Sequence, residues 1–164
     1  MYNFESYTET QSASDPYSFF DAISNGDIFQ VSKSLNSGLS PDTRTSDGFP
    51  ALHRAVKENN LEIAYILLSH GAKVDARSAG GLTALMVASY YDFDDIAGWL
   101  LLFGANQFLY SDNGCYALGI AAAEGNLRSI GVLIEALPRD NPYQPVKSLR
   151  KARIIAEKNK HFKT

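Results

Sequence analysis

Apolar and polar positions along this chain follow the spacing of short helices joined by turns. Within residues 48–80, a first run of small and apolar residues is followed by a longer run with apolar residues at every third or fourth position. The longer run contains Leu61, Ala64, Leu67 and Leu68. This spacing places side chains on one face of a helix. Gly48 and Gly71, which tolerate a positive φ, are placed to make the turn before the first helix and to close the second. The segment therefore predicts a turn, a helix, a loop, a second helix and an extended connection.

The same pattern returns every 33 residues. Four positions of the unit keep the same residue in three successive units: Gly48, Gly81 and Gly114; Ala51, Ala84 and Ala117; Leu52, Leu85 and Leu118; Ala55, Ala88 and Ala121. A more divergent unit precedes these three and begins near Asp15. Self-similarity at a fixed period of this length is the sequence signature of a repeat solenoid.

The unit GFPALHRAVKENNLEIAYILLSHGAKVDA resembles the ankyrin repeat, and the resemblance covers roughly residues 16–137. It implies an all-α ankyrin-repeat solenoid of about four helix-turn-helix repeats, at 15–47, 48–80, 81–113 and 114–137. It also implies a module that binds other proteins and catalyses nothing.

The chain departs from the family's Thr-Pro-Leu-His motif, in which the threonine and histidine hydrogen-bond and brace each repeat. The equivalent segments are Pro50-Ala51-Leu52-His53, Thr83-Ala84-Leu85-Met86 and Tyr116-Ala117-Leu118-Gly119. No unit keeps both residues, so we expect a less stable array than one with the full motif. Because array stability is a sum of repeat and interface contributions, weakness should be local.

The two ends differ from the middle. We expect residues 1–14 to be a flexible arm, 138–145 a proline-rich linker, and 146–164 a basic C-terminal capping helix and tail. The first repeat should present a polar outer face. Its polar residues are Ser24, Asn25, Gln30, Ser32, Lys33 and Ser34.

Charge is distributed unevenly around a net value of −3. Up to Leu137 there are seven Lys/Arg and sixteen Asp/Glu, giving −9, and from Pro138 onward eight and two, giving +6. The basic tail is either a solvated helix face or a site for an acidic partner. The overall charge argues against a nucleic-acid partner. A single cysteine excludes a disulfide framework, and the absence of a signal-like start or a long apolar run predicts a cytoplasmic protein without a membrane segment.

No residue pattern predicts catalysis, a cofactor or a metal. His53 lies on the bracing motif and is expected to be structural. Cys115 is interpreted as a small residue at a loop tip, the alternative being a reactive thiol. The acidic residues Asp92, Asp94 and Asp95 lack the spacing of a calcium loop and are interpreted as a solvated helix start. Trp99 aligns with Ile66 and Val132 and is expected in the core.

The resemblance places partner binding on the concave face, which is made of loop tips, here called fingers, and the ends of the first helices. The fingers contribute Arg44, Asp47, Phe49, Arg77, Leu82, Tyr110, Asp112 and Asn113. The helix ends contribute Lys57, Glu58, Tyr90 and Tyr91. Tyrosine and arginine dominate binding hot spots. The alternative for Tyr90 and for Phe93 is packing against the adjacent helix.

The hypothesis is therefore a non-catalytic protein-binding module, monomeric by itself, that neutralises its target in the manner of an immunity protein or antitoxin. The acidic body would suit a basic target. An adaptor that bridges two partners is the second hypothesis, and an enzyme subunit is the third.

Overall fold

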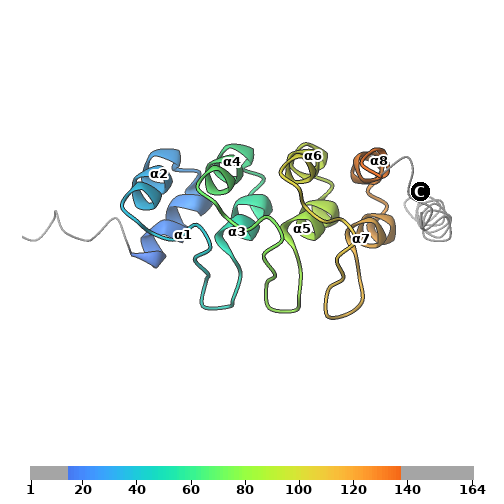
Figure 1. Ribbon diagram of the computed structural model, residues 1–164, viewed down its shortest axis with the longest axis horizontal. Coiled ribbons are helices and arrows are strands. Elements are labelled where there is room, and N and C mark those ends of the chain that lie inside the picture. The colour runs from blue at the N-terminus through green and yellow to red at the C-terminus, as the bar shows by residue number, and fades with distance from the viewer. Residues whose placement is uncertain (1–14, 138–164) are drawn as a thin grey trace, which may run out of the picture.

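The computed structural model describes residues 15–137, which form eight helices and no strand. The helices are α1 (Pro16–Asn25), α2 (Ile28–Asn36), α3 (Ala51–Lys57), α4 (Leu61–Ser69), α5 (Ala84–Tyr91), α6 (Asp94–Leu102), α7 (Ala117–Glu124) and α8 (Leu127–Glu135). Figure 1 shows the odd-numbered helices in one row, the even-numbered helices in a second, and three long fingers that project from the first row. The all-α repeat solenoid is confirmed. The predicted arm, linker and capping helix lie outside the described residues.

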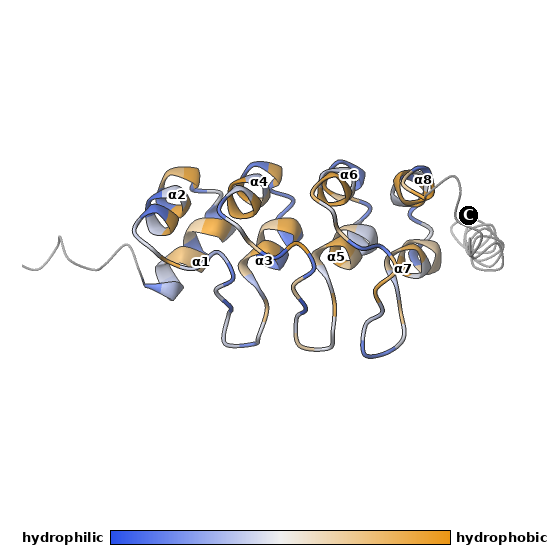
Figure 2. Cartoon of the chain, viewed as in Figure 1, coloured by the Kyte–Doolittle hydropathy of each residue, from blue (hydrophilic) through white to orange (hydrophobic). Residues whose placement is uncertain are grey.

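Equivalent positions of successive repeats build a continuous core. Leu52, Leu85 and Leu118 lie on the first helices and are buried, as are Leu67, Leu100 and Leu133 on the second helices. Each buried leucine contributes about 1.5–3 kcal/mol relative to an exposed one. Alanines one turn along the first helices let the helices approach closely, and Figure 2 shows hydrophobic residues concentrated on the helices.

A left-handed residue ends each first helix and turns the chain back. Gly26 and Gly125 take φ values of 72° and 75°. At the two equivalent positions in the middle of the array, Asn59 and Asp92 take φ values of 53° and 59°. Asparagine and aspartate tolerate this conformation better than other residues with a side chain, so the same turn is kept in all four repeats.

The fingers are joined to one another by arginines one period apart. The Arg44 guanidinium donates to the carbonyl oxygen of Arg77 at 2.7 Å, and that of Arg77 donates to the carbonyl of Tyr110 at 2.7 Å. Asp42 and Asp75 likewise accept the backbone N–H groups of Lys73 and Asn106 in the next finger, at 2.9 and 3.0 Å. These bonds hold the three fingers in register.

The expectation that Trp99 belongs to the core is wrong, because its side chain is 42% exposed. The backbones of α4 and α6 make little direct contact, and aromatic rings fill the seam between them. The Trp99 ring lies 5.9 Å from that of Tyr65 and 6.2 Å from that of Phe103, measured between ring centroids. An indole is too large for the partly buried position that Ile66 and Val132 occupy, so it lies in the seam with one side open.

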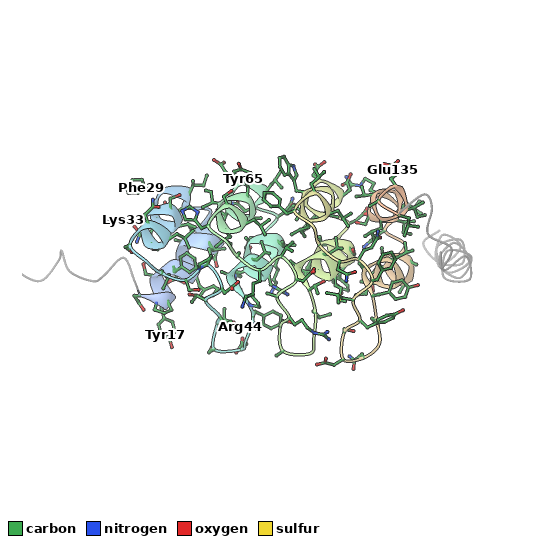
Figure 3. The ribbon with its side chains drawn as sticks, in the orientation of Figure 1. Tyr17, Phe29, Lys33, Arg44, Tyr65 and Glu135 are labelled. Atoms are coloured by element: carbon green, nitrogen blue, oxygen red, sulfur yellow. The ribbon has the colours of Figure 1, made fainter. Side chains whose placement is uncertain are left out.

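The predicted polar outer face of the first repeat is only partly present. Ser34 is buried, because it is equivalent to the core residue Leu67. The most exposed large apolar side chains of this repeat are Tyr17 and Phe29, each 77% exposed. Figure 3 shows Tyr17, Phe29 and Lys33 projecting from this end of the array.

Candidate functional site

A groove of about 530 Å³ runs across repeats two to four, between the fingers and the first helices. One wall is made by Phe49, Leu82 and Cys115, which are equivalent residues directly after the turns at the tips of the three fingers. The floor consists of apolar side chains on α5 and α7, and the far rim of residues near the ends of α3, α5 and α7. The groove thus lies between finger residues and the ends of first helices, the two sets of positions from which the resemblance draws its partner-binding residues.

Each finger is closed by the same backbone hydrogen bond, which fixes the wall. The N–H groups of Thr45, Ser78 and Ser111 donate to the carbonyl oxygens of Phe49, Leu82 and Cys115, at 2.9, 2.9 and 2.7 Å. Because these bonds repeat with the period of the array, the three wall residues leave their fingers at equivalent points. The wall is therefore a row of three side chains, two of them large and apolar and the third a small thiol.

His53 connects α3 to the next finger. It is only 2% exposed, and its Nε2 lies 2.8 Å from the carbonyl oxygen of Leu82. A carbonyl oxygen only accepts, so Nε2 carries the hydrogen and donates it. Burial lowers the pKa of His53, and the positive charge of Arg44 lowers it further, against the raising effect of the Leu82 bond. The structural role expected for His53 is confirmed by this bond.

Nδ1 of the same imidazole is buried and has no hydrogen-bond partner among the described residues. In the neutral tautomer with the hydrogen on Nε2, Nδ1 is an acceptor. The bracing threonine that the family motif would place at position 50 is replaced by Pro50, which has no hydroxyl to donate. The altered motif thus coincides with an unsatisfied buried acceptor.

Two tyrosines form the middle of the far rim. Tyr90 and Tyr91 are both about half exposed, and their rings meet edge to face at 5.0 Å. The Tyr91 ring also stacks on Phe93 at 5.4 Å. The side-chain amide of Asn126 donates to the Tyr90 carbonyl at 2.6 Å and so holds the end of α5. The Tyr91 ring is thus held between Tyr90 and Phe93, and both tyrosines keep about half of their surface open to solvent.

The predicted partner-binding residues fall into two sets. Those that line the groove are Phe49, Lys57, Leu82, Tyr90, Tyr91 and Asn113. The remainder, which lie outside it, are Arg44, Asp47, Glu58, Arg77, Tyr110 and Asp112. In this second set the arginines join the fingers, Asp112 pairs with Arg77 at 3.3 Å, and Glu58 pairs with Arg54 at 3.1 Å.

The floor of the groove contains residues that sequence reasoning did not select. Met86, Val87 and Ile120 line it from α5 and α7. Met86 occupies the position of His53 one repeat later, and Val87 and Ile120 occupy that of Arg54. The sequence signal that could have identified these floor residues is the replacement of polar residues by apolar ones at helix positions that face the fingers.

The acidic run at residues 92–95 joins two repeats, and its interpretation as a solvated helix start is wrong for Asp92. This carboxylate accepts the Ser129 N–H at 2.9 Å and pairs with Arg128 at 3.3 Å. It therefore caps α8 from the preceding repeat, since Asn126, the residue before α8, makes no side-chain cap. Asp94 pairs with the same arginine at 3.4 Å.

Residues 15–137 contain no cluster of three side chains able to hold a metal ion. No helix in the same range is long and apolar enough to cross a membrane. What the groove offers a ligand is apolar area, tyrosine hydroxyls, and one charge of each sign, from Lys57 and Glu124.

Comparison with known proteins identifies the repeats. The family model for ankyrin repeats in three copies matches residues 19–109. Regulatory subunit 27 of protein phosphatase 1 from mouse is 36% identical over 97 residues, and the human protein is 35% identical over the same length. Each alignment covers 58% of this chain and 63% of the relative. A putative ankyrin repeat-containing protein of Treponema pallidum is 34% identical over 128 residues, which are 76% of this chain and 42% of the relative.

Proposed function

The chain belongs to the ankyrin-repeat family, whose repeats bind other proteins, and from this premise we propose that it neutralises a target protein by occupying the target's surface with its groove. The proposal is a cytoplasmic, monomeric, non-catalytic inhibitor that acts as immunity proteins and antitoxins do. The observation that carries it is the groove itself, in which Tyr90 and Tyr91 stand over an apolar floor. Tyrosines in such a setting dominate binding energy in protein interfaces.

Two further observations support inhibition by binding. The phosphatase relatives are named as regulatory subunits, a role in which one protein modulates another. Residues 15–137 contain seven Lys/Arg and fourteen Asp/Glu, a net charge of −7. An acidic body accelerates association with a basic target and disfavours acidic competitors.

Non-catalytic action is in keeping with the chemistry of the groove. His53 is buried, its pKa is lowered, and its Nε2 is engaged by the Leu82 carbonyl. The Cys115 thiol is exposed. These groups build the wall of the groove and hold its shape.

The test is capture of the target from a lysate of the native organism, followed by an activity assay of the captured protein with and without an equimolar amount of this chain. Replacing Tyr90 and Tyr91 together by alanine should weaken capture about 100-fold, since two hot-spot residues at about 1–2 kcal/mol each amount to about 3 kcal/mol. The helical circular-dichroism signal should remain.

A matched variant replaces two exposed aromatic residues away from the groove, Tyr17 and Phe29, by alanine. It should capture the target as the wild type does. Capture that survives the groove substitutions would show that the target binds elsewhere, and a captured target whose activity is unchanged would exclude neutralisation.

An adaptor function is the second candidate, and one observation favours it. Tyr65, Trp99 and Phe103 form an exposed aromatic cluster on the second helices, on a different face from the groove. Exposed aromatic patches mark interaction sites. An adaptor would bind two proteins at once, and Trp99→Ala would release one of them while the groove substitutions release the other.

A further inference from the structure

The groove is electrically asymmetric along its length. Lys57 and Glu124 are the two charged residues among those lining it, and they lie at opposite ends. Lys57 is the last residue of α3 and Glu124 the last of α7. Between them α5, with the sequence ALMVASYY, carries no charge. A ligand that crosses the groove therefore meets a cation, an apolar stretch and an anion, in that order.

Neither charge is neutralised by a salt bridge within residues 15–137. Both side chains are exposed. Nearby charges are engaged with each other: Arg54 with Glu58 at 3.1 Å, and Arg77 with Asp112 at 3.3 Å. The two free charges are thus the ones available to a ligand in the groove.

Glu124 is not accounted for by the stability of its own helix. The C-terminal end of a helix carries a partial negative charge, so a lysine there is favourable and a glutamate unfavourable, each by about 0.3–1 kcal/mol. Lys57 suits the end of α3, whereas Glu124 is disfavoured at the end of α7, which has no basic residue in its last turn. A residue that lowers the stability of its own helix is a candidate for a role outside that helix.

The separation of the charges sets the size of the ligand. The helices α3, α5 and α7 lie side by side in Figure 1. Packed helices are about 8–10 Å apart, so two steps place the charges about 16–20 Å apart. An extended peptide advances about 3.3 Å per residue and spans this distance in about five or six residues.

We infer that the groove takes a short extended segment of the target with a fixed charge polarity. An acidic side chain of that segment lies at Lys57, large apolar side chains lie over α5 between Met86 and the rim of Tyr90 and Tyr91, and a basic side chain lies at Glu124. The inference rests on the proposed function and adds the chemistry and the direction of what is bound.

The experiment uses a displayed library of random 12-residue peptides, selected on the full chain and counter-selected on a variant with Tyr90 and Tyr91 replaced by alanine. Selected peptides should carry one acidic and one basic residue about five or six positions apart, with large apolar residues between them. The best peptide and a twin with its acidic and basic residues exchanged are then synthesised.

Both peptides are titrated against the wild type and against the double variant Lys57→Glu with Glu124→Lys. The selected peptide should bind the double variant about tenfold more weakly than the wild type, the scale expected for two exposed charge pairs turned from attraction to repulsion. The exchanged twin should show the reverse preference. Unchanged circular dichroism and an unchanged urea midpoint control for folding of the double variant.

Each result decides a different point. Peptides that need the tyrosines but bind the wild type and the double variant equally would overturn the charge polarity and leave the groove as the binding site. A twin that does not recover affinity on the double variant would also overturn it. A library that yields no peptide dependent on Tyr90 and Tyr91 would overturn the inference that the groove takes a short extended segment, while the proposed function would be decided separately by capture of the target protein with the tyrosine variant.

Discussion

Replacing Pro50 by threonine should stabilise the fold, because α3 begins without a side-chain cap and a buried nitrogen atom in its first turn lacks a hydrogen-bond partner. Pro50 precedes the helix and provides no side-chain cap, and His53 Nδ1 is buried without a hydrogen-bond partner. At the equivalent position before α5, the Thr83 hydroxyl accepts the Met86 N–H at 3.4 Å. Pro50 has φ −62° and ψ 152°, an extended conformation close to the −95° and 162° of Thr83. Threonine therefore fits this backbone.

The expected gain combines three contributions. A side-chain cap contributes about 1 kcal/mol, and satisfying a buried acceptor recovers about 1–3 kcal/mol. Losing the proline costs about 0.4–1 kcal/mol, because the unfolded chain becomes less restricted. Pro50 pairs with Arg44 across a bridge whose hydrogen bonds are made by the flanking residues Thr43, Thr45, Phe49 and Ala51, so the missing proline N–H is not part of it. The net stabilisation should be about 1–3.5 kcal/mol, and each kcal/mol should raise Tm by roughly 2–4 °C for a chain of this size.

Urea denaturation followed by circular dichroism measures this change as a shift in midpoint at constant slope. Pro50→Val is the matched control, since valine has the shape of threonine without its hydroxyl. The threonine variant should be more stable than both the wild type and the valine variant. Equal midpoints for the threonine and valine variants would refute the reasoning, because the hydroxyl would then have found no partner.

Three further predictions concern polar groups that the structure places between repeats. Burial lowers the pKa of His53 below its ordinary value of 6.5, so just below pH 6.5 the unfolded chain binds a proton at this residue and the folded chain does not. The free energy of unfolding should therefore be highest above about pH 6.5 and fall as the pH drops below it. In urea titrations between pH 7 and 5, His53→Gln should make this fall smaller. Arg77→Ala should lower the free energy of unfolding by about 1 kcal/mol through loss of the bond to the Tyr110 carbonyl, and Arg77→Lys should lower it by less. Hydrogen exchange in the third finger would show whether the destabilisation is local. Asp92→Ala should lower the free energy of unfolding by about 1 kcal/mol, because the Ser129 N–H at the start of α8 loses its acceptor. Asp92→Asn keeps an acceptor oxygen and should restore most of this stability. Equal urea midpoints for the two variants would show that Asp92 does not cap α8.

The repeat period was sufficient to predict the helices and most of the core. Residues one period apart, such as Leu52 and Leu85, occupy equivalent places because each repeat packs on a copy of itself. The same argument failed for Trp99, since equivalence fixes the position of the Cα atom and says nothing of whether a larger ring fits beneath the surface.

The candidate site was only partly predictable for a related reason. Alignment placed Arg44 and Arg77 at the fingers, but the direction in which a long side chain turns depends on the neighbouring repeat. Both turn along the array and bind the next finger. The apolar floor was not predicted, because the sequence pattern identifies Met86 only as the residue that replaces the motif's histidine. In the structure its side chain lines the groove.

The bonds between repeats have a mechanical consequence. Within residues 15–137, every polar side-chain bond that joins two repeats connects residues 29 to 37 positions apart, as between His53 and Leu82 or between Asp92 and Ser129. No such bond reaches past the adjacent repeat in this part of the chain. A molecule pulled by its two ends should therefore unfold one repeat at a time. Each unfolding event should release 33 residues and lengthen the chain by about 110 Å.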